Sequence, residues 1–469
     1  MRHPQQQSSG MKPLLKPLCA VLLMGGVQPL WAGGFGVTVQ SAVGAGNAAT
    51  GHAMAEDASA MYYNPALLYG MDGRQVNGGI SLLNTDITVT NTGSTIPSAA
   101  AGFPVQGENV AEPGGLSVAP SFYFRGDSIA KNLVYGVGVN APFGVHTEYD
   151  KDSFARYEGT ETSLKTLNIN PALAMRLSEQ FDIGAGLNVQ VGQAILSRSL
   201  DSYLVCQRFV GLGAAPAGTC GALGLNSASN VATDGQVTIE ADGIGYGFNL
   251  GAAYRPDSNT TLSLGLRSPV KYELEGDADF KHSANLLGLG EANLAAAGLG
   301  DQNMTADLKM PASASLSAAR RINDRLTVYG DVTWTEWSSV PEIRIQFPDT
   351  VADDSVTDLQ WEDTVRVGAG LTYQLNEKTR LRAGIAQDPT PTPSPKNRTL
   401  RAPSSDNLWL SAGVSHAINR HFTIDAGFSF VRPSDASINY TAPGSTDYTT
   451  RADTDSDVMV GAISVNYRF

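Results

Sequence analysis

The sequence has little charge and no long apolar run. Asp, Glu, Lys and Arg make up 16% of its 469 residues, whereas about 25% is usual in soluble domains. The longest apolar stretch, around Leu18–Val27, is shorter than the roughly 20 residues that a membrane-spanning helix needs. A helical membrane protein is therefore excluded, and the low charge distinguishes the chain from an ordinary soluble domain.

Basic residues, cysteines and catalytic motifs are also scarce. Lys and Arg number 32 against 45 Asp and Glu, which gives a net charge of −13 and argues against a nucleic-acid partner. Three cysteines cannot build a disulfide scaffold or a four-cysteine zinc site. The six histidines lack metal-ligand spacing, and the sequence has no Gly-x-Ser-x-Gly elbow or phosphate-binding loop. We therefore expect no cofactor, no metal and no enzyme activity.

One acidic repeat has the spacing of calcium ligands. Asp453, Asp455 and Asp457 alternate along the chain near its C-terminus, but the other ligands of a calcium-binding loop are missing. We therefore interpret the repeat as part of a solvated surface loop.

The N-terminus has the parts of an export signal. Basic residues come first, the apolar stretch Leu18–Val27 follows, and a small residue occupies the cleavage position. We predict that residues 1–32 are a signal peptide and that the mature chain begins at Gly33. Met11 is an alternative start to Met1, because the first ten residues add little to the signal.

Beyond the signal, apolar and polar residues alternate with a period of two. The pattern is clear in residues 166–177, 181–191, 365–375 and 422–430. Such alternation indicates β-strands with one apolar face and one face that is polar or glycine. Two environments fit it: a soluble sandwich, or a barrel with lipid outside and a polar lumen.

The lengths of the connections favour the barrel. Fourteen candidate strands can be placed, and the connections between them alternate between 16 residues or more and 7 residues or fewer. Long connections at one rim and tight turns at the other are typical of outer-membrane barrels. The predicted strands are 75–84, 114–125, 133–145, 162–177, 181–198, 240–255, 259–273, 307–320, 325–338, 361–375, 378–388, 405–418, 422–432 and 457–469.

The two ends of the mature chain agree with an all-β, fourteen-stranded antiparallel transmembrane barrel. The last strand ends on Phe469, which resembles the signal that the barrel assembly machinery reads in bacterial outer-membrane proteins. The first strand must pair with the last, because every backbone polar group in lipid needs a partner. Residues 33–73 lack the two-residue period and are rich in Gly and Ala, yet too apolar for an exposed arm. We predict that they plug the lumen of a barrel formed by residues 74–469.

Five segments occur in the order found in a known family, and together they resemble the FadL/TodX (OMPP1) outer-membrane transporters of long-chain fatty acids and aromatic hydrocarbons. The resemblance covers the mature chain and implies a monomer in the outer membrane of a Gram-negative bacterium, with the plug as a hatch. The matching segments are Ala55–Leu68 with its Asn64-Pro65-Ala66, Tyr135–Gly144 followed by Glu148-Tyr149, Arg267–Lys271, Trp334–Ser338, and Asn397–Gly413.

The family resemblance also implies a route: hydrophobic substrate is captured outside and escapes sideways through a gap beside a kinked third strand. Pro142 has no N–H, so it can break the strand ladder there. An ordinary strand end turning into the next loop is the alternative interpretation. We expect the Asn64-Pro65-Ala66 part of the hatch to touch this kink. The kink is assigned to Asn140, Ala141, Pro142, Phe143 and Gly144.

Two long loops carry candidate features. Leu286, Leu287 and Leu289 belong to an apolar stretch, which is expected to form a capture surface or to pack against the preceding long loop. That preceding loop contains Cys206 and Cys220. Because the cell surface is oxidising, we predict a structural disulfide between them.

Two basic residues are candidates for a fatty-acid head group. Arg198 and Lys271 fall on strands where the family resemblance places basic residues near ligand. Ordinary lumen-lining charge is the alternative.

The sequence therefore predicts outer-membrane transport of a hydrophobic compound, most simply a long-chain fatty acid. The alternatives are an uptake channel for aromatic or aliphatic hydrocarbons, and a general porin or adhesin, which the plug argues against. An outer-membrane phospholipase would need a Ser/His pair on adjacent strands, and no credible pair is found. The expected partners are hydrophobic small molecules, outer-membrane lipid and lipopolysaccharide, and the assembly machinery through Phe469.

Overall fold

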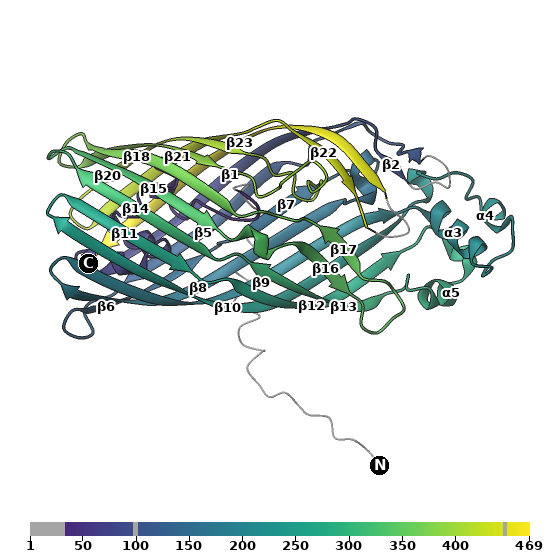
Figure 1. Ribbon diagram of the computed structural model, residues 1–469, viewed down its shortest axis with the longest axis horizontal. Helices are drawn as coiled ribbons and strands as arrows, with labels where there is room; N and C mark the ends of the chain where they lie inside the picture. The colour runs from purple at the N-terminus through teal and green to yellow at the C-terminus, as the bar shows by residue number, and fades with distance from the viewer. Residues whose placement is uncertain (1–32, 97–101, 444–447) are drawn as a thin grey trace, which may run out of the picture.

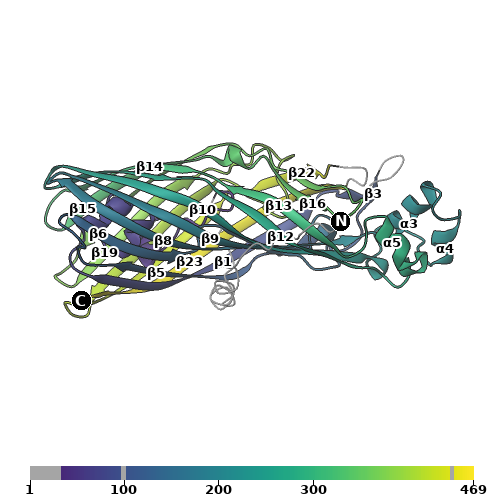
Figure 2. The same cartoon turned by 90° about the horizontal axis from the view of Figure 1, so that it is seen from below.

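A computed structural model describes residues 33–96, 102–443 and 448–469, so the predicted signal peptide lies outside the described residues. The chain forms a closed antiparallel β-barrel, with its longer helices gathered beyond one end (Figures 1 and 2). We call this the loop end and the opposite end, where the C-terminus lies, the hatch end. No described helix has the length and apolar character needed to cross a membrane.

The wall has fourteen strands, and several of them are interrupted. An interrupted strand appears as two consecutive elements with a short break between them. The elements are β1 Gln75–Asn91, β2 Thr95–Ile96, β3 Phe103–Pro104, β4 Val110–Ala111, β5 Gly115–Arg125, β6 Leu133–Asn140, β7 Gly144–Glu148, β8 Glu161–Ser178, β9 Phe181–Leu200, β10 Gly235–Asp257, β11 Thr260–Arg267, β12 Val270–Lys281, β13 Gln302–Met310, β14 Ser313–Arg321, β15 Leu326–Thr335, β16 Glu342–Gln346, β17 Ser355–Asp358, β18 Thr364–Gln374, β19 Thr379–Asp388, β20 Asn407–Ala417, β21 Phe422–Pro433, β22 Ala436–Thr441 and β23 Thr449–Arg468.

The barrel closes between its first and last strands. β1 pairs with β23 from Gln75↔Arg468 to Asn91↔Ala452, and with β5 on its other side. Beyond the Gln75↔Arg468 pair, the Phe469 N–H donates to the carbonyl of Arg74 at 3.1 Å. This closure confirms the predicted fourteen-stranded barrel and leaves no strand edge open at the seam.

Side chains alternate between the outside and the inside of the wall. On β20, Leu408 and Leu410 are 44% and 47% exposed, whereas Trp409 between them is fully buried. The same alternation gives an outer surface of exposed Leu, Val, Ile and Phe on most strands. Such a surface belongs in lipid, and the polar or small residues belong inside.

Residues 33–73, the hatch, lie inside the barrel as short turns. They contain α2 Ala42–Gly46, η1 Ala58–Tyr62 and η2 Pro65–Gly70. Each turn begins at a polar cap, because the side chains of Ser41, Asp57 and Asn64 accept backbone N–H groups of the turn that follows. These local bonds replace a strand ladder, which explains the missing two-residue period.

Glycines of the wall make room for the hatch at two places. A Cβ on Gly251 would lie 1.8 Å from Asn64 Oδ1, and one on Gly184 would lie 2.4 Å from the Ala66 nitrogen. Across the barrel, Gly384, Gly413 and Gly427 meet the backbone of α2 and the residue after it in the same way. Only glycine permits such close backbone approach.

The two long loops at the loop end pack on each other. Cys206 in α3 (Ser202–Gly211) and Cys220 in α4 (Thr219–Ala222) form a disulfide with an S–S distance of 2.08 Å. Leu286 in η5 (Leu286–Leu289) is fully buried in a cluster with both cysteines. The remaining short helices are η3 Phe154–Tyr157, η4 Val231–Thr233, α5 Glu291–Ala296 and η6 Trp337–Ser339.

The acidic repeat lies in a strand, which corrects the expectation of a surface loop. Asp453, Asp455 and Asp457 belong to β23, which begins at Thr449 rather than near residue 457. Arg432 on β21 pairs with Asp455 at 3.1 Å and with Asp457 at 2.8 Å. These contacts are exposed cross-strand ion pairs.

Candidate functional site

The third wall strand is broken where the sequence predicted a kink. β6 ends at Asn140 and β7 begins at Gly144. β5 pairs with β6 only from Phe122 to Arg125, and within the described residues β7 pairs only with β8. Among the residues that the structure describes, the remainder of β5, toward Gly115, pairs only with β1. The backbone ladder is therefore absent between β5 and β7.

The beginning of the hatch supplies hydrogen bonds to the broken strand. The Gly144 N–H donates to the Phe35 carbonyl at 2.9 Å, and the Val37 N–H donates to the Pro142 carbonyl at 2.9 Å. Gln40 Nε2 donates to the Ala141 carbonyl at 3.0 Å. Backbone groups that the neighbouring strand leaves unpaired are thus satisfied from inside the barrel.

The contact expected between Asn64-Pro65-Ala66 and the kink is wrong. Asn64 Nδ2 donates to the Ala252 carbonyl at 2.9 Å and to Ser263 Oγ at 2.6 Å, on β10 and β11. The glycines on β9 and β10 determine this position, because they provide the space that the turn around Asn64 requires. Residues 35–40 take the place beside the kink instead.

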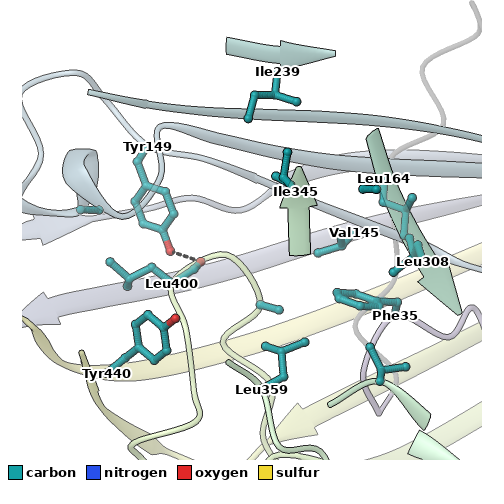
Figure 3. Packing of buried hydrophobic residues seen from close by; sticks show 14 of the residues in the cluster. Phe35, Val145, Tyr149, Leu164, Ile239, Leu308, Ile345, Leu359, Leu400 and Tyr440 are labelled. Carbon is teal, nitrogen blue, oxygen red and sulfur yellow. Dashed lines mark hydrogen bonds between the residues drawn. The ribbon is translucent and has the colours of Figure 1, made fainter. Parts of the chain in front are cut away.

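Toward the loop end, the lumen holds an apolar cavity that opens to solvent, here called the loop-end cavity; its empty volume, with the solvent-open part included, is about 800 Å³. Figure 3 shows Phe35, Val145, Leu164, Leu308 and Ile345 around the same interior. Carbon atoms dominate the lining, so the cavity suits an apolar ligand. It is lined by Phe35, Val145, Thr162, Ser163, Leu164, Ala194, Leu196, Ile239, Ala241, Leu274, Met304, Ala306, Asp307, Leu308, Ile343, Ile345, Thr357, Leu359, Thr399, Arg401 and Ala402.

One guanidinium lines this cavity without an ion-pair partner. Arg401, in the inward-folded loop between β19 and β20, donates to the carbonyl of Glu161 at 3.1 Å and to Thr162 Oγ1 at 3.0 Å. No carboxylate of the described residues lies within ion-pair distance of it, and burial lowers the pKa of Arg401. Arg198 on β9 is close enough to repel it. The two residues make one end of the cavity cationic.

The other predicted head-group residue faces away from the lumen. Lys271 is 54% exposed and pairs with Asp307 at 2.9 Å and Glu273 at 3.8 Å. The lumen-facing prediction for Lys271 is therefore wrong. The predicted strand 259–273 breaks at Ser268 and Pro269, and the break exchanges its inward and outward positions.

A second solvent-open cavity, the hatch-end cavity, lies between the hatch and the wall, and its empty volume, with the solvent-open part included, is about 930 Å³. Its lining includes Pro142 and Phe143 of the kink, hatch residues such as Tyr63, and Trp337 of the wall. Phe35, which lines the loop-end cavity, has its ring centroid 6.3 Å from that of Trp337 and 4.8 Å from that of Trp361. These three rings lie between the two cavities, next to the broken strand.

Sequence reasoning missed Phe35 and Arg401. Phe35 belongs to a Gly-rich stretch in which a single aromatic residue is the only local signal. Arg401 lies in the segment 397–413, which carried the family resemblance without a role for this residue. Its position beside strands β8 and β9 depends on the inward fold of the loop.

Comparisons with known proteins agree with this architecture. A family model described as outer membrane protein transport protein (OMPP1/FadL/TodX) matches residues 24–469. The long-chain fatty acid transport protein of Escherichia coli O6:H1 is 28% identical over 407 residues, which cover 86% of this chain and 87% of that protein. Outer membrane protein P1 of Haemophilus influenzae is 26% identical over 413 residues, 86% of each chain.

Solved structures share the fold. A Pseudomonas aeruginosa FadL homologue gives a TM-score of 0.82 at 22% identity, covering 93% of this chain and 100% of that one. The Ralstonia pickettii toluene transporter TbuX gives a TM-score of 0.63 at 20% identity, with coverages of 92% and 98%. Because the family model spans nearly the whole sequence, the chain belongs to the OMPP1/FadL/TodX family, whose members are outer-membrane transport channels for hydrophobic compounds and not enzymes.

Proposed function

We propose that this protein carries long-chain fatty acids across the outer membrane, with the tail in the loop-end cavity and the carboxylate at Arg401 and Arg198. The observation that carries the proposal is the apolar cavity ending in a guanidinium that has no ion-pair partner among the described residues. The sequence relatives that are named long-chain fatty acid transport proteins support the same substrate class.

The physical chemistry of the cavity favours a single-chain amphiphile. Burial of an alkyl tail contributes roughly 25 cal/mol per Å² of apolar surface. A half-buried guanidinium without an anion is costly, so a carboxylate that reaches Arg401 adds a charge-assisted contact. An uncharged hydrocarbon is bound only through the burial of its apolar surface, because it has no carboxylate to contact Arg401.

We further propose that substrate leaves sideways into the membrane between β5 and β7. A hydrophobic solute gains nothing from a water-filled exit, whereas transfer from an apolar cavity to lipid costs little. The missing ladder between these strands supports the route, and hydrogen bonds from residues 35–37 close it from inside. In this proposal the rest of residues 33–73 remains in place as a plug.

Capture from outside remains a proposal for the loop end. Leu287 is 37% exposed and Leu289 is partly buried, whereas Leu286 belongs to the packing between the two loops. The capture surface therefore rests on Leu287 and Leu289. A monomeric state, contact with lipopolysaccharide and recognition of Phe469 by the assembly machinery also remain proposals.

Binding titrations with a fatty acid and its methyl ester test the head-group site. Arg401→Ala should weaken hexadecanoate binding by about ten- to a hundred-fold, because a charge-assisted contact contributes about 1.5–3 kcal/mol. The ester should bind wild type and variant alike. Arg344→Ala is a matched control, because Arg344 is exposed and paired with Glu342 and Asp354. Equal effects of Arg401→Ala on acid and ester would refute the fatty-acid proposal.

A second candidate substrate class is aromatic hydrocarbon. The rings of Phe35, Trp337 and Trp361 between the cavities offer edge and face contacts to a small aromatic ligand. Toluene uptake by cells that express Phe35→Ala or Arg401→Ala separates the two classes. A hydrocarbon channel would be impaired by the first substitution and unaffected by the second.

A further inference from the structure

Glu158 is a buried carboxylate at the cationic end of the loop-end cavity. It follows η3 in the connection between β7 and β8 and is 2% exposed. Glu158 Oε1 accepts the Leu400 N–H at 2.6 Å, and Oε2 accepts the Thr450 hydroxyl at 2.6 Å. Both oxygens are thus held by groups from separate parts of the chain. The carboxylate has a fixed position beside the loop that carries Arg401.

The groups around Glu158 form one electrostatic cluster. Arg401 attracts Glu158, and Arg198 repels Arg401 across the same space. Three tyrosines complete the surroundings, and each of them is influenced by the charge of Glu158: Tyr149, Tyr440 and Tyr448. Tyr149 donates to the Leu400 carbonyl at 2.8 Å, and Tyr440 lies nearby (Figure 3).

The charges of this cluster do not cancel. It holds two guanidiniums and one carboxylate, so one positive charge remains when all three are ionised. No ion pair within 4 Å joins Glu158 to Arg198 or Arg401 in the described residues, so the carboxylate acts on them through space. A neutral Gln of the same shape could accept the Leu400 N–H through its amide oxygen and donate to the Thr450 hydroxyl through its amide nitrogen, and therefore the hydrogen bonds alone do not require a charge here.

We infer that Glu158 determines how strongly the cavity binds anions: its carboxylate offsets one of the two guanidiniums, so that the site accepts a single negative charge and can release it. This inference rests on the proposed function, because it assumes that a head group binds beside Arg401. Glu158 is a positioning and specificity residue and need not touch the ligand. A site with two uncompensated guanidiniums would hold a hydrophobic anion too tightly for transport.

Proton uptake by Glu158 should change this balance near neutral pH. Burial raises the pKa of Glu158 to about 7, although the hydrogen bonds and Arg401 oppose the increase. Below that pH the carboxyl is neutral and the site carries two positive charges, so anions bind more tightly. Above that pH the carboxyl is ionised and the site carries one net positive charge. Burial raises the pKa of Tyr149 well above its usual value, and Arg401 keeps its proton in this range.

Decane-1-sulfonate and decan-1-ol are suitable probes, because the first stays anionic at every relevant pH and the second is uncharged. We would titrate both into the full-length mature protein in nanodiscs at pH 6 and pH 8. Wild type should bind the sulfonate several-fold more tightly at pH 6. Glu158→Gln should bind it about ten-fold more tightly than wild type at pH 8 and lose the pH dependence. Decanol binding should not change.

Glu148→Gln is the matched control. It removes one negative charge from the same part of the chain, but the Glu148 side chain is 75% exposed and screened by water. Its binding of both probes should equal that of wild type. Heat-modifiable gel migration verifies that each variant is folded.

Three outcomes would overturn the inference. If Glu158→Gln lowers the affinity for both probes by the same factor, Glu158 only anchors the loop at Leu400. If Glu158→Gln binds the sulfonate as wild type does, its charge has no effect. If wild type itself shows no pH dependence for the sulfonate, the carboxylate does not titrate beside the ligand, and this result needs no variant. Failure of the proposed function appears differently: wild type and Arg401→Ala would then bind the sulfonate equally well.

Discussion

The two ends of the barrel interior are built from similar alternating strands, yet the hatch end holds an insert, residues 33–73, whereas the loop-end cavity is lined mainly by the wall strands and an inward-folded loop. At the hatch end, glycine and polar inward positions lie among apolar ones such as Trp409 and Val431, and residues 33–73 pack against them. At the loop end the inward positions are Leu, Ile, Met and Ala, and the loop-end cavity remains. Polar inward residues can fix an insert by directed bonds, whereas apolar ones leave room for a ligand.

Directed polar contacts attach the hatch to the wall. Arg382 on β19 is ion-paired with Glu56 of the hatch and donates to Ser415 Oγ at 2.6 Å. Arg382 is 3% exposed. On another side of the barrel, Asn64 bonds to β10 and β11. A hatch held at several places around the wall is a fixed part of the interior, while residues 35–37 form the part next to the opening.

The largest expected effect comes from removing the hatch. Deletion of residues 33–73 should convert a non-conducting barrel into an open pore, because only this segment fills the hatch end. Planar-bilayer conductance measures the change, and the deletion of residues 212–218, in a mostly exposed loop, is a control for a deletion outside the lumen. Unchanged low conductance would show that the wall closes the lumen without the hatch.

A smaller effect should follow from loosening one attachment. Glu56→Ala removes the hatch carboxylate from the buried Arg382, which keeps Asp425 at 3.6 Å, and should weaken hatch docking by about 1.5–3 kcal/mol. Intermittent conductance steps, absent in wild type, are the expected readout. Glu342→Ala removes an exposed ion pair with Arg344 and is the matched control. A silent Glu56→Ala variant would mean that Asn64 and α2 are sufficient to hold the hatch.

The next prediction concerns the opening between the two ends. Pro142→Val restores a backbone N–H and should let the third strand pair more regularly with β5, so that uptake of fatty acid decreases several-fold while the barrel still folds. Pro256→Val is the control, because Pro256 is an exposed residue of β10, which among the described residues pairs with β9, β11 and β12 and not with the strands at the opening. Normal uptake in a variant with a restored ladder would contradict lateral release.

The smallest effect is expected at the outer surface of the loop end. Leu287→Ser should lower ligand affinity about two-fold or less, because Leu287 is partly exposed and the cavity below is intact. Leu286→Ser should instead destabilise the loops by about 2–4 kcal/mol, because Leu286 is fully buried against the disulfide-linked loop. Thermal melting and binding titrations separate the two effects.

Much of the wall could be predicted because a strand in lipid has a strict pattern. Alternation along β20 and β21, the tight turns and the terminal strand all follow from the need to expose apolar side chains and pair every backbone group. A break at Pro142 was one of two interpretations that the residues allowed, because proline cannot donate to a ladder.

The lumen could not be predicted in the same way, and Lys271 shows why. Inward residues are odd-numbered on β11, where Ser263 binds Asn64, and even-numbered on β12, where Leu274 lines the cavity. The change occurs at Ser268–Pro269 between the two strands. A two-residue period reverses its faces with a one-residue shift, so a small irregularity places a predicted head-group residue outside.

The sequence by itself therefore determined the barrel and its strand number, because both depend on local periodicity. The residues around Pro142 also fit an ordinary strand end, so only the family resemblance favoured a kink there. Only the tertiary structure decided which residues meet inside. Asn64 lies against β10 and β11, Phe35 lies against the kink, and Arg401 faces the cavity beside Glu158. These contacts join segments far apart in the chain, and they depend on wall curvature and on the space that glycines leave.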